Sequence, residues 1–244
     1  DTDVFCIIKK ALGDLPLRVA TGDIGILMTA VSSLKTTSSR QKALLRHLWR
    51  PQRFLAILEK FTNEASLSTE RFDGFQAEKS FANQAKEIGL RSRSEIIERI
   101  ENLLQDSKEA PISTTELEVI NSLLNIGDKC PQALIKLKDL LSDMPALGTA
   151  IEKFEKRLSA LDNANVDLSS IDFEVSYGRT SMEYYDGFVF GFYSENHINL
   201  PPIATGGRYD ALTKHIGKGL EIPAVGGVVR PDLIIQSKGF KDND

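Results

Sequence analysis

The chain has 244 residues, a length that fits one large domain or two small ones. Hydrophobic residues make up 41% of it, so a substantial core is expected and wholesale disorder is excluded. The net charge of −4 provides no overall attraction for a polyanion, and no apolar run is long enough to span a membrane. We therefore expect neither nucleic acid nor membrane as a partner.

Cysteine and histidine usage indicates the compartment and argues against a metal site. Cys6 and Cys130 lie far apart and form no ligand spacing with each other. The three histidines are scattered, so no metal site is expected. Two lone thiols and the absence of a signal-peptide pattern predict a cytoplasmic location. The chain begins at Asp1 rather than Met, so we expect it to be part of a longer protein.

The first 40 residues alternate between helix and strand. Residues 4–12 predict a short helix, and the alternation of Leu17 to Ala20 predicts a strand. Gly22-Asp23 indicates a turn, after which residues 24–34 predict an apolar helix. Residues 35–40 are rich in Ser and Thr and predict a loop.

The middle of the chain, residues 41–165, predicts helices. Ser92 with Glu95, and Ser113 with Glu116, fit the capping box, in which each partner caps a free backbone N–H of the other. The apolar faces that follow indicate helices near residues 96–104, 117–124, 134–141 and 151–161. Such faces form a core far more often than a ligand site.

Strands return after residue 167. Alternation over residues 171–177 predicts a half-buried strand, and residues 188–193 predict a second strand that pairs with it antiparallel. Residues 209–216 and 232–236 predict helices around a small-residue strand at residues 224–229. Strands that do not alternate one for one with helices indicate an α+β fold with an antiparallel sheet. The expected division is a core in residues 1–40 and 167–238, a helical insertion in residues 41–166, and a tail in residues 239–244.

Glu183, Tyr184 and Tyr185 form the first candidate site. A buried carboxylate pairs with an ammonium or imidazolium, tyrosine hydroxyls donate or accept, and aromatic faces attract cations. Such a set suits an amino acid with a positive side chain. The alternative is a structural role, with strand tyrosines beside a surface Glu, and composition alone favours it.

Gly206, Gly207, Arg208, Tyr209 and Asp210 form the second candidate. Paired glycines let a ligand approach the backbone, or they supply a turn between strand and helix. The spacing is not that of a phosphate-binding P-loop, so nucleotide binding by that mechanism is excluded.

The order of three segments produces a resemblance to a known family. Thr180 to Gly187, Gly206 to Asp210, and Ala224 to Gly227 resemble the histidine-binding half of class II histidyl-tRNA synthetases. Residues 1–35 also look like the segment that follows the family's second class II motif. The resemblance covers roughly the first 35 and the last 75 residues. It implies a class II synthetase-like α+β fold with a helical insertion, and a histidine pocket formed by Glu183, Tyr184, Tyr185, Gly206, Gly207, Arg208 and Tyr209.

Departures from the synthetase pattern decide which branch of the family is expected. Thr180 falls where a synthetase has the arginine that stabilises amino-acid activation, and Arg179 is one place early, so in a strand it would point the other way. Leu233 falls where the ATP-binding arginine of the third motif stands, and Arg230 lies three positions earlier. The chain therefore resembles more closely the paralogue without synthetase activity, the regulatory subunit of ATP phosphoribosyltransferase.

That resemblance implies no catalytic residues and no cofactor in this chain. It implies that the chain self-associates as a dimer and joins a catalytic subunit in a hetero-octamer. The subunit would activate the first step of histidine biosynthesis and help it respond to free histidine. The alternatives are a fragment of a histidyl-tRNA synthetase-type ligase and a helical interaction domain with an incidental strand-rich end.

Overall fold

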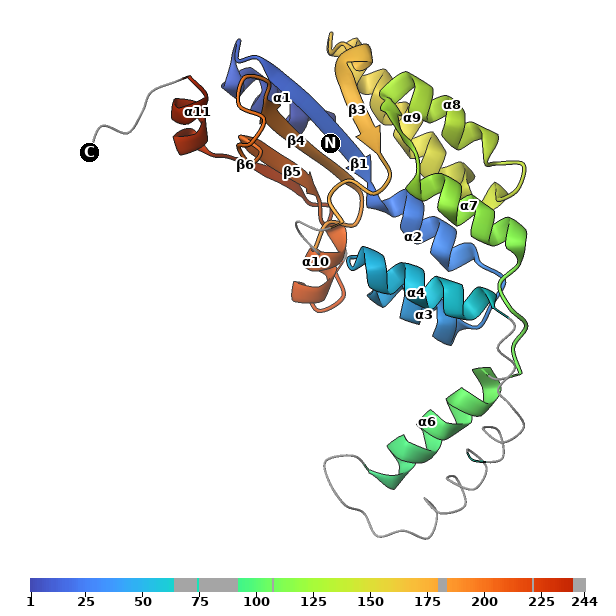
Figure 1. The fold of residues 1–244 in the computed structure, drawn as a ribbon. Coiled ribbons are helices and arrows are strands. Elements are labelled where there is room, and N and C mark those ends of the chain that lie inside the picture. Colours follow the sequence, from blue (N-terminus) through green and yellow to red (C-terminus); the bar gives the residue numbers. More distant parts are fainter. Residues whose placement is uncertain (64–73, 75–91, 107, 180–183, 221, 239–244) are drawn as a thin grey trace. The chain divides into compact units, whose positions relative to one another are not determined.

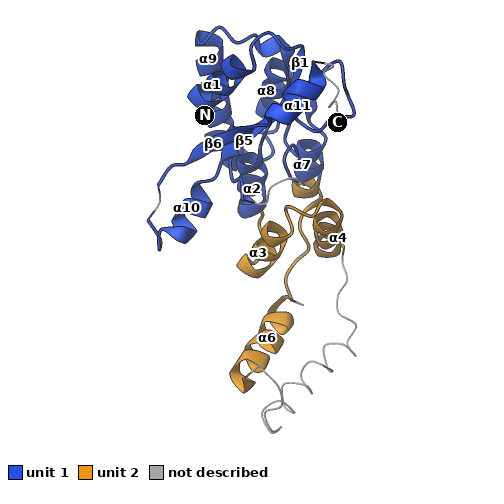
Figure 2. Cartoon of the chain, turned by 90° about the vertical axis from the view of Figure 1, so that its left-hand side faces the viewer, with its two compact units in different colours: residues 1–33, 118–244 blue, residues 34–117 orange. Residues whose placement is uncertain are grey.

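The computed structural model describes residues 1–63, 74, 92–106, 108–179, 184–220 and 222–238. Contacts divide the chain into two compact units, residues 1–33 with 118–244, and residues 34–117 (Figure 2). The helices between residues 118 and 163 thus belong with the sheet, whereas the helical segment expected from the sequence ran from residue 41 to residue 166.

A six-stranded sheet forms the first unit, in the order β2-β3-β1-β4-β5-β6 (Figure 1). In chain order its strands are β1 (Leu17–Asp23), β2 (Gly127–Lys129), β3 (Ile171–Glu174), β4 (Phe188–Ser194), β5 (Ala204–Arg208) and β6 (Val225–Val229). Neighbouring strands are antiparallel, except that β1 and β3 are parallel. The predicted α+β class is confirmed, and the sheet is mixed because of this one pair.

The helices of the first unit are α1 (Thr2–Leu12), α2 (Ile24–Ser33), α8 (Cys130–Asp139), α9 (Gly148–Asn163), α10 (Asp210–Ile216), α11 (Pro231–Ser237) and most of α7 (Thr114–Leu124). Short 3-10 helices, η1 (Pro145–Leu147) and η2 (Leu168–Ser170), flank α9. Helices α1, α8 and α9 contact the sheet (Figure 1).

Aromatic rings fix α1 and α9 on one face of the sheet. The fully buried ring of Phe5 in α1 lies 5.4 Å from the ring of Phe190 and 5.2 Å from that of Phe192. Phe154 of α9 stacks at 4.3 Å on Phe173 of β3. Burying a side chain of this size stabilises a fold by about 1.5–3 kcal/mol. This helix-covered face is therefore the core.

The predicted pairing of the strand at residues 171–177 with the one at 188–193 is wrong. Strand β1 lies between them, because Val19 pairs with Ile171 on one side and with Phe192 on the other. Strand β3 also ends early, at Glu174, where the Tyr177 N–H donates to the Glu174 carbonyl in a turn. Local alternation indicates a strand but not its neighbour in the sheet. Here the neighbour is β1, which comes from the distant N-terminal part of the chain.

Two glycine motifs that the sequence suggested as turns lie inside strands. Gly22 pairs with Val189 across β1 and β4, and Gly206 pairs with Phe190 across β4 and β5. Neither glycine has room for a side chain. A Cβ on Gly22 would lie 2.8 Å from the Tyr177 Cβ, and one on Gly206 would lie 2.4 Å from the Phe190 ring. Close packing, rather than a turn, explains these glycines.

The second unit contains α3 (Ser38–Arg46), α4 (Pro51–Thr62) and α6 (Arg93–Asp106). Its central polar contact is the buried guanidinium of Arg40, which pairs with the Asp106 carboxylate and donates to the Ala110 carbonyl at 2.9 Å. Across the described parts of both units, no helix combines the length and apolar character needed to cross a membrane.

Both predicted capping boxes are present. The Ser92 N–H donates to the Glu95 carboxylate at 2.7 Å, and the Glu95 N–H donates back to the Ser92 hydroxyl at 3.4 Å. Ser113 and Glu116 exchange the same two bonds, each at 3.3 Å. Reciprocal capping satisfies N–H groups that the first turn of a helix leaves without partners.

The two cysteines are expected to differ in reactivity. Burial raises the pKa of the Cys130 thiol to about 11, whereas the Cys6 side chain is half-buried. At pH 8 a thiol reagent should modify Cys6 much faster than Cys130 in the native protein, because the thiolate is the reactive form. Mass spectrometry after brief labelling measures this, with denatured protein, in which both thiols should react, as the control. Equal native rates would contradict the buried position of Cys130.

Candidate functional site

Three tyrosines gather at the β4–β5–β6 end of the sheet. The rings of Tyr184 and Tyr185 are 4.6 Å apart, and Tyr209 lies 5.8 Å from Tyr184 and 6.4 Å from Tyr185. The Tyr184 hydroxyl donates to the Tyr185 hydroxyl at 3.5 Å. We call Tyr184, Tyr185 and Tyr209 the tyrosine cluster. Two of the predicted site segments thus meet in space.

Two glycines lie beneath the tyrosine cluster. A Cβ on Gly207 would lie 2.7 Å from the Tyr185 ring, and one on Gly226 would lie 3.0 Å from the Tyr209 hydroxyl oxygen. Gly207 and Gly226 are cross-strand partners in β5 and β6. The tyrosines therefore rest on backbone, which is the arrangement that small residues in a strand permit.

Tyr185 contributes a protonated hydroxyl to the cluster. Burial, followed by the hydrogen bond from Tyr184, raises the pKa of the Tyr185 hydroxyl. Tyr185 is therefore protonated throughout the physiological range and can donate as well as accept a hydrogen bond. Phenol hydroxyls together with electron-rich ring faces suit a flat, polar or cationic group such as imidazole.

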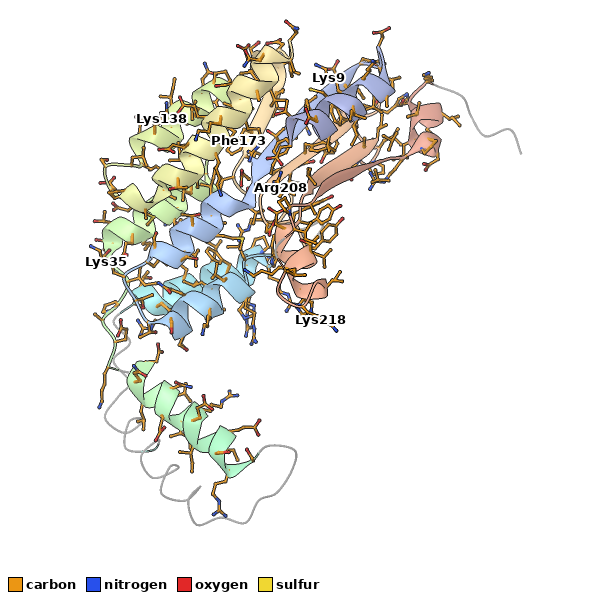
Figure 3. The ribbon with its side chains drawn as sticks, turned by 180° about the vertical axis from the view of Figure 1, so that it is seen from behind. Lys9, Lys35, Lys138, Phe173, Arg208 and Lys218 are labelled. Carbon is orange, nitrogen blue, oxygen red and sulfur yellow. The ribbon has the colours of Figure 1, made fainter. Side chains whose placement is uncertain are left out.

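Arg208 and Gly206, predicted for the same pocket, lie on the opposite face of β5. A Cβ on Gly206 would meet the Phe190 ring, which packs against α1. The Arg208 Nε donates to the Asp1 carboxylate at 2.8 Å, and its Nη1 donates to Asp210 at 3.0 Å. Successive strand residues face opposite sides. The structure therefore brings Gly207 to the tyrosines, whereas Gly206 and Arg208 face the helices (Arg208 is labelled in Figure 3).

Asp186 connects the two predicted motifs through backbone contacts. Its carboxylate accepts the N–H of Asp210 at 3.1 Å and that of Ala211 at 2.5 Å, which caps the start of α10. Partial burial raises the pKa of Asp186, although these two N–H groups favour its charged form. The Asp186 N–H in turn donates to the Arg208 carbonyl. Asp186 therefore fixes where Tyr185 and Tyr209 stand relative to one another.

Arg230 is a candidate that sequence reasoning did not place in the site. Its guanidinium donates to the Pro202 carbonyl at 2.9 Å and to the Thr205 hydroxyl at 3.4 Å, and its charge acts on the Tyr185 hydroxyl. Arg230 and Gly226 are four residues apart, so in an extended chain they share a side, and this spacing was the available signal. Arg230 gives the tyrosine side of the sheet a positive charge that could meet a carboxylate.

The structure describes only some of the remaining residues that the family resemblance singled out. Glu183 and Thr180 lie outside the described residues. Leu233, in α11, is buried with 6% of its surface exposed. A buried aliphatic side chain has no donor for a phosphate. Arg179 is also buried, with 4% exposed.

Known proteins share this fold. The sheet order and the helices on its inner face define a class II aminoacyl-tRNA synthetase-like α+β fold. A model of the family described as histidyl-tRNA synthetase matches residues 93–234. The chain belongs to the histidyl-tRNA synthetase family.

Curated relatives carry a more specific name. The chain is 28% identical over 257 residues to a protein of Agrobacterium fabrum named ATP phosphoribosyltransferase regulatory subunit, with 97% of this chain and 66% of the relative covered. A protein of Rhizobium rhizogenes with the same name is 28% identical over 254 residues, with 95% and 65% covered. The chain therefore spans slightly less than two thirds of the length of these relatives.

Solved structures show the same fold. A crystal structure named as an ATP phosphoribosyltransferase regulatory subunit/histidyl-tRNA synthetase from Bacillus halodurans matches with a TM-score of 0.57 and 18% identity, over 97% of this chain and 49% of that one. Histidyl-tRNA synthetase from Nostoc also matches with a TM-score of 0.57, at 15% identity, over 99% of this chain and 47% of that one.

A methyl group on Gly207 should destabilise the fold beneath the tyrosine cluster. In Gly207→Ala the new Cβ would lie 2.7 Å from both the Phe188 carbonyl oxygen and the Tyr185 ring. Overpacking of this kind costs about 1–3 kcal/mol in the free energy of unfolding, measured by urea denaturation. Gly148→Ala is the matched control, because Gly148 has helical angles and nothing within 4 Å of its Cβ position. The control should be neutral or stabilised by up to about 1 kcal/mol. Equal stability of the two variants would contradict the packing described here.

Proposed function

We propose that this chain is the larger part of a non-catalytic regulatory subunit that activates ATP phosphoribosyltransferase and contributes to histidine feedback in the first step of histidine biosynthesis. The observation that carries the proposal is similarity along 97% of the chain to a relative of that name. The similarity includes the helical middle as well as both ends of the sheet. Membership in the histidyl-tRNA synthetase family supports the proposal that the tyrosine cluster is a histidine site.

The tyrosine cluster supports histidine as the ligand. The imidazole ring has one N–H donor and one acceptor nitrogen, which match the two hydrogen-bonding roles of a tyrosine hydroxyl. Tyr185 and Tyr209 carry such hydroxyls, and they pack closely over Gly207 and Gly226. Arg230 supplies the positive charge that the histidine carboxylate requires.

The alternative function is that of a histidyl-tRNA synthetase-type ligase. Ligation requires activation of histidine with ATP, and the family pattern uses an arginine in the third motif for the nucleotide. Leu233 stands at that position here and its side chain is buried in the core of the sheet unit. This burial favours the regulatory proposal, because the site has lost a cation that the chemistry needs.

Regulation requires two assembly states that bind histidine with different affinity. A ligand shifts an equilibrium only by its differential affinity for the two states. The proposed partner is the catalytic subunit of ATP phosphoribosyltransferase, in a hetero-octamer in which this subunit also forms a dimer. The cytoplasmic location expected from the sequence belongs to the same proposal.

The full-length protein should bind and activate an ATP phosphoribosyltransferase catalytic subunit from the same cell. Mixing the two should raise the rate of phosphoribosyl transfer and shift both proteins to an earlier elution volume in size-exclusion chromatography. The same full-length protein should show only background histidine-dependent pyrophosphate exchange, because Leu233 replaces a charged ATP ligand.

The two assays separate the two functions. Clear pyrophosphate exchange without an effect on the transferase would establish the ligase instead. Neither activation nor co-elution, with exchange at background, would also refute the regulatory assignment.

Removing a hydroxyl from the tyrosine cluster should weaken histidine binding. A neutral hydrogen bond contributes about 0.5–1.5 kcal/mol net, so Tyr185→Phe or Tyr209→Phe should raise the Kd for histidine roughly three- to tenfold. Isothermal titration calorimetry on the wild type and on each variant measures this effect.

Tyr193→Phe is the matched control for these variants. Its hydroxyl bonds to the Tyr177 hydroxyl at 2.9 Å rather than to the tyrosine cluster. The affinity of Tyr193→Phe for histidine should equal that of the wild type. An equal loss in all three variants would point to a general change in the sheet, and the absence of heat with wild type at millimolar histidine would show that this chain does not sense histidine.

A further inference from the structure

Arg230 lies on the same side of the sheet as the tyrosine cluster. The chain passes from β6 into α11 at this residue (Figure 1). In β5, Thr205 and Gly207 are two residues apart and therefore share a side. The Tyr185 ring lies over Gly207, and the Arg230 guanidinium donates to the Thr205 hydroxyl at 3.4 Å. The arginine and the tyrosines therefore stand along the same side of one strand.

The protein holds the Arg230 guanidinium in place. Its Nη1 donates to the Pro202 carbonyl at 2.9 Å as well as to the Thr205 hydroxyl. The backbone N–H of Arg230 donates to the Ile203 carbonyl at 2.8 Å, and the residue is half-buried. A side chain that is ordered before a ligand arrives loses little conformational entropy on binding. Arg230 is therefore preorganised to receive an anion.

The charge of Arg230 is not neutralised by a neighbour. Arg18, Arg157 and Arg208 of the same unit each pair with a carboxylate. No carboxylate among the described residues pairs with Arg230, and none of those residues accepts from its Nε or Nη2. These two N–H groups lie on one edge of the guanidinium, which can bind both oxygens of a carboxylate. The arginine therefore has a free edge suited to a ligand acid.

The spacing along β5 suits a free amino acid. Two residues along a strand span roughly 7 Å. This is comparable with the length of an extended histidine from its ring to its carboxylate. The neighbouring position on β4 is closed, because Gly191 pairs with Thr205 and a Cβ on Gly191 would overlap the Tyr177 hydroxyl. A histidine whose ring meets the tyrosine cluster can therefore reach Arg230 with its carboxylate, on the β6 side of Thr205.

We propose that Arg230 makes the site selective for a free α-carboxylate, so that histidine binds far more tightly than its alcohol or its decarboxylated amine. This inference rests on the proposed function, because it takes histidine as the ligand of the tyrosine cluster. The tyrosines recognise the ring, which all three compounds share, whereas only the acid offers an anion to Arg230. A site with both contacts distinguishes the finished amino acid from other compounds that carry the same ring.

Histidine, histidinol and histamine are the probes that test this selectivity. Isothermal titration calorimetry uses the full-length protein at constant ionic strength. Histidinol and histamine should bind roughly ten- to hundredfold more weakly than histidine, because a charge-assisted contact is lost. Arg230→Gln should weaken histidine binding by a similar factor and leave the other two ligands unchanged. The preference for histidine should thus nearly disappear in this variant, whereas Arg230→Lys, which keeps the charge but not the planar edge, should restore part of it.

Arg18→Gln is the matched control. Arg18 pairs in register with Tyr193, two residues from Gly191, so it lies on the same side of the sheet. Its side chain is exposed and pairs with Asp172 rather than with Thr205. The control removes the same charge from the same side, and it should keep the full preference for histidine.

The outcomes separate this inference from the histidine site itself. Equal affinity of the wild type for histidine and histidinol would overturn the role of Arg230 and leave the histidine site in place, and this comparison needs no variant. An unchanged preference in Arg230→Gln, or an equal loss of preference in Arg18→Gln, would overturn it too. A large fall in the thermal unfolding midpoint of unliganded Arg230→Gln would assign Arg230 a structural role instead. No binding of histidine by the wild type would refute histidine as the ligand, and this inference with it.

Discussion

Much of the structure depends on two adjacent residues without side chains in β5. The Phe190 ring crowds Gly206 from the helix-covered face, and the Tyr185 ring crowds Gly207 from the other. A Cβ at either position would lie under 3 Å from a neighbouring atom. The two glycines therefore allow close packing on both faces of the strand. The core around Phe5 and the tyrosine cluster are both consequences of this constraint.

The polar contacts on the helix-covered face follow from the same alternation. Arg208, the next residue in β5, reaches Asp1 and Asp210, while Arg157 joins Asp1 to Asp23. Arg157 and Asp23 expose only 8% and 7% of their side chains. A buried ion pair is weak evidence of net stabilisation, but losing one partner leaves a charge uncompensated and costs about 3–5 kcal/mol. The network therefore fixes where α9 and α1 lie on the sheet more than it adds stability.

The proposed regulatory function would require an enzyme fold to keep binding and lose chemistry. In that proposal the tyrosine cluster binds the histidine side chain, whereas Leu233, which is buried, stands where the synthetase pattern predicts a nucleotide ligand. Such a loss would require no change of fold, because an aliphatic residue on α11 packs into the core. Binding and chemistry would be separable because the proposal assigns them to different elements.

The sequence by itself determined the α+β class, both capping boxes and most helices, because these depend on contacts between residues a few positions apart. It also indicated which segments make the candidate site. Only the tertiary structure decided that β1 separates β3 from β4, since strand neighbours come from distant parts of the chain. It also decided that Gly207 faces the tyrosines while Gly206 and Arg208 face the helices, and that the Arg230 guanidinium donates to the Thr205 hydroxyl. A motif of consecutive residues does not reveal which of them share a side until the strand that contains it is known.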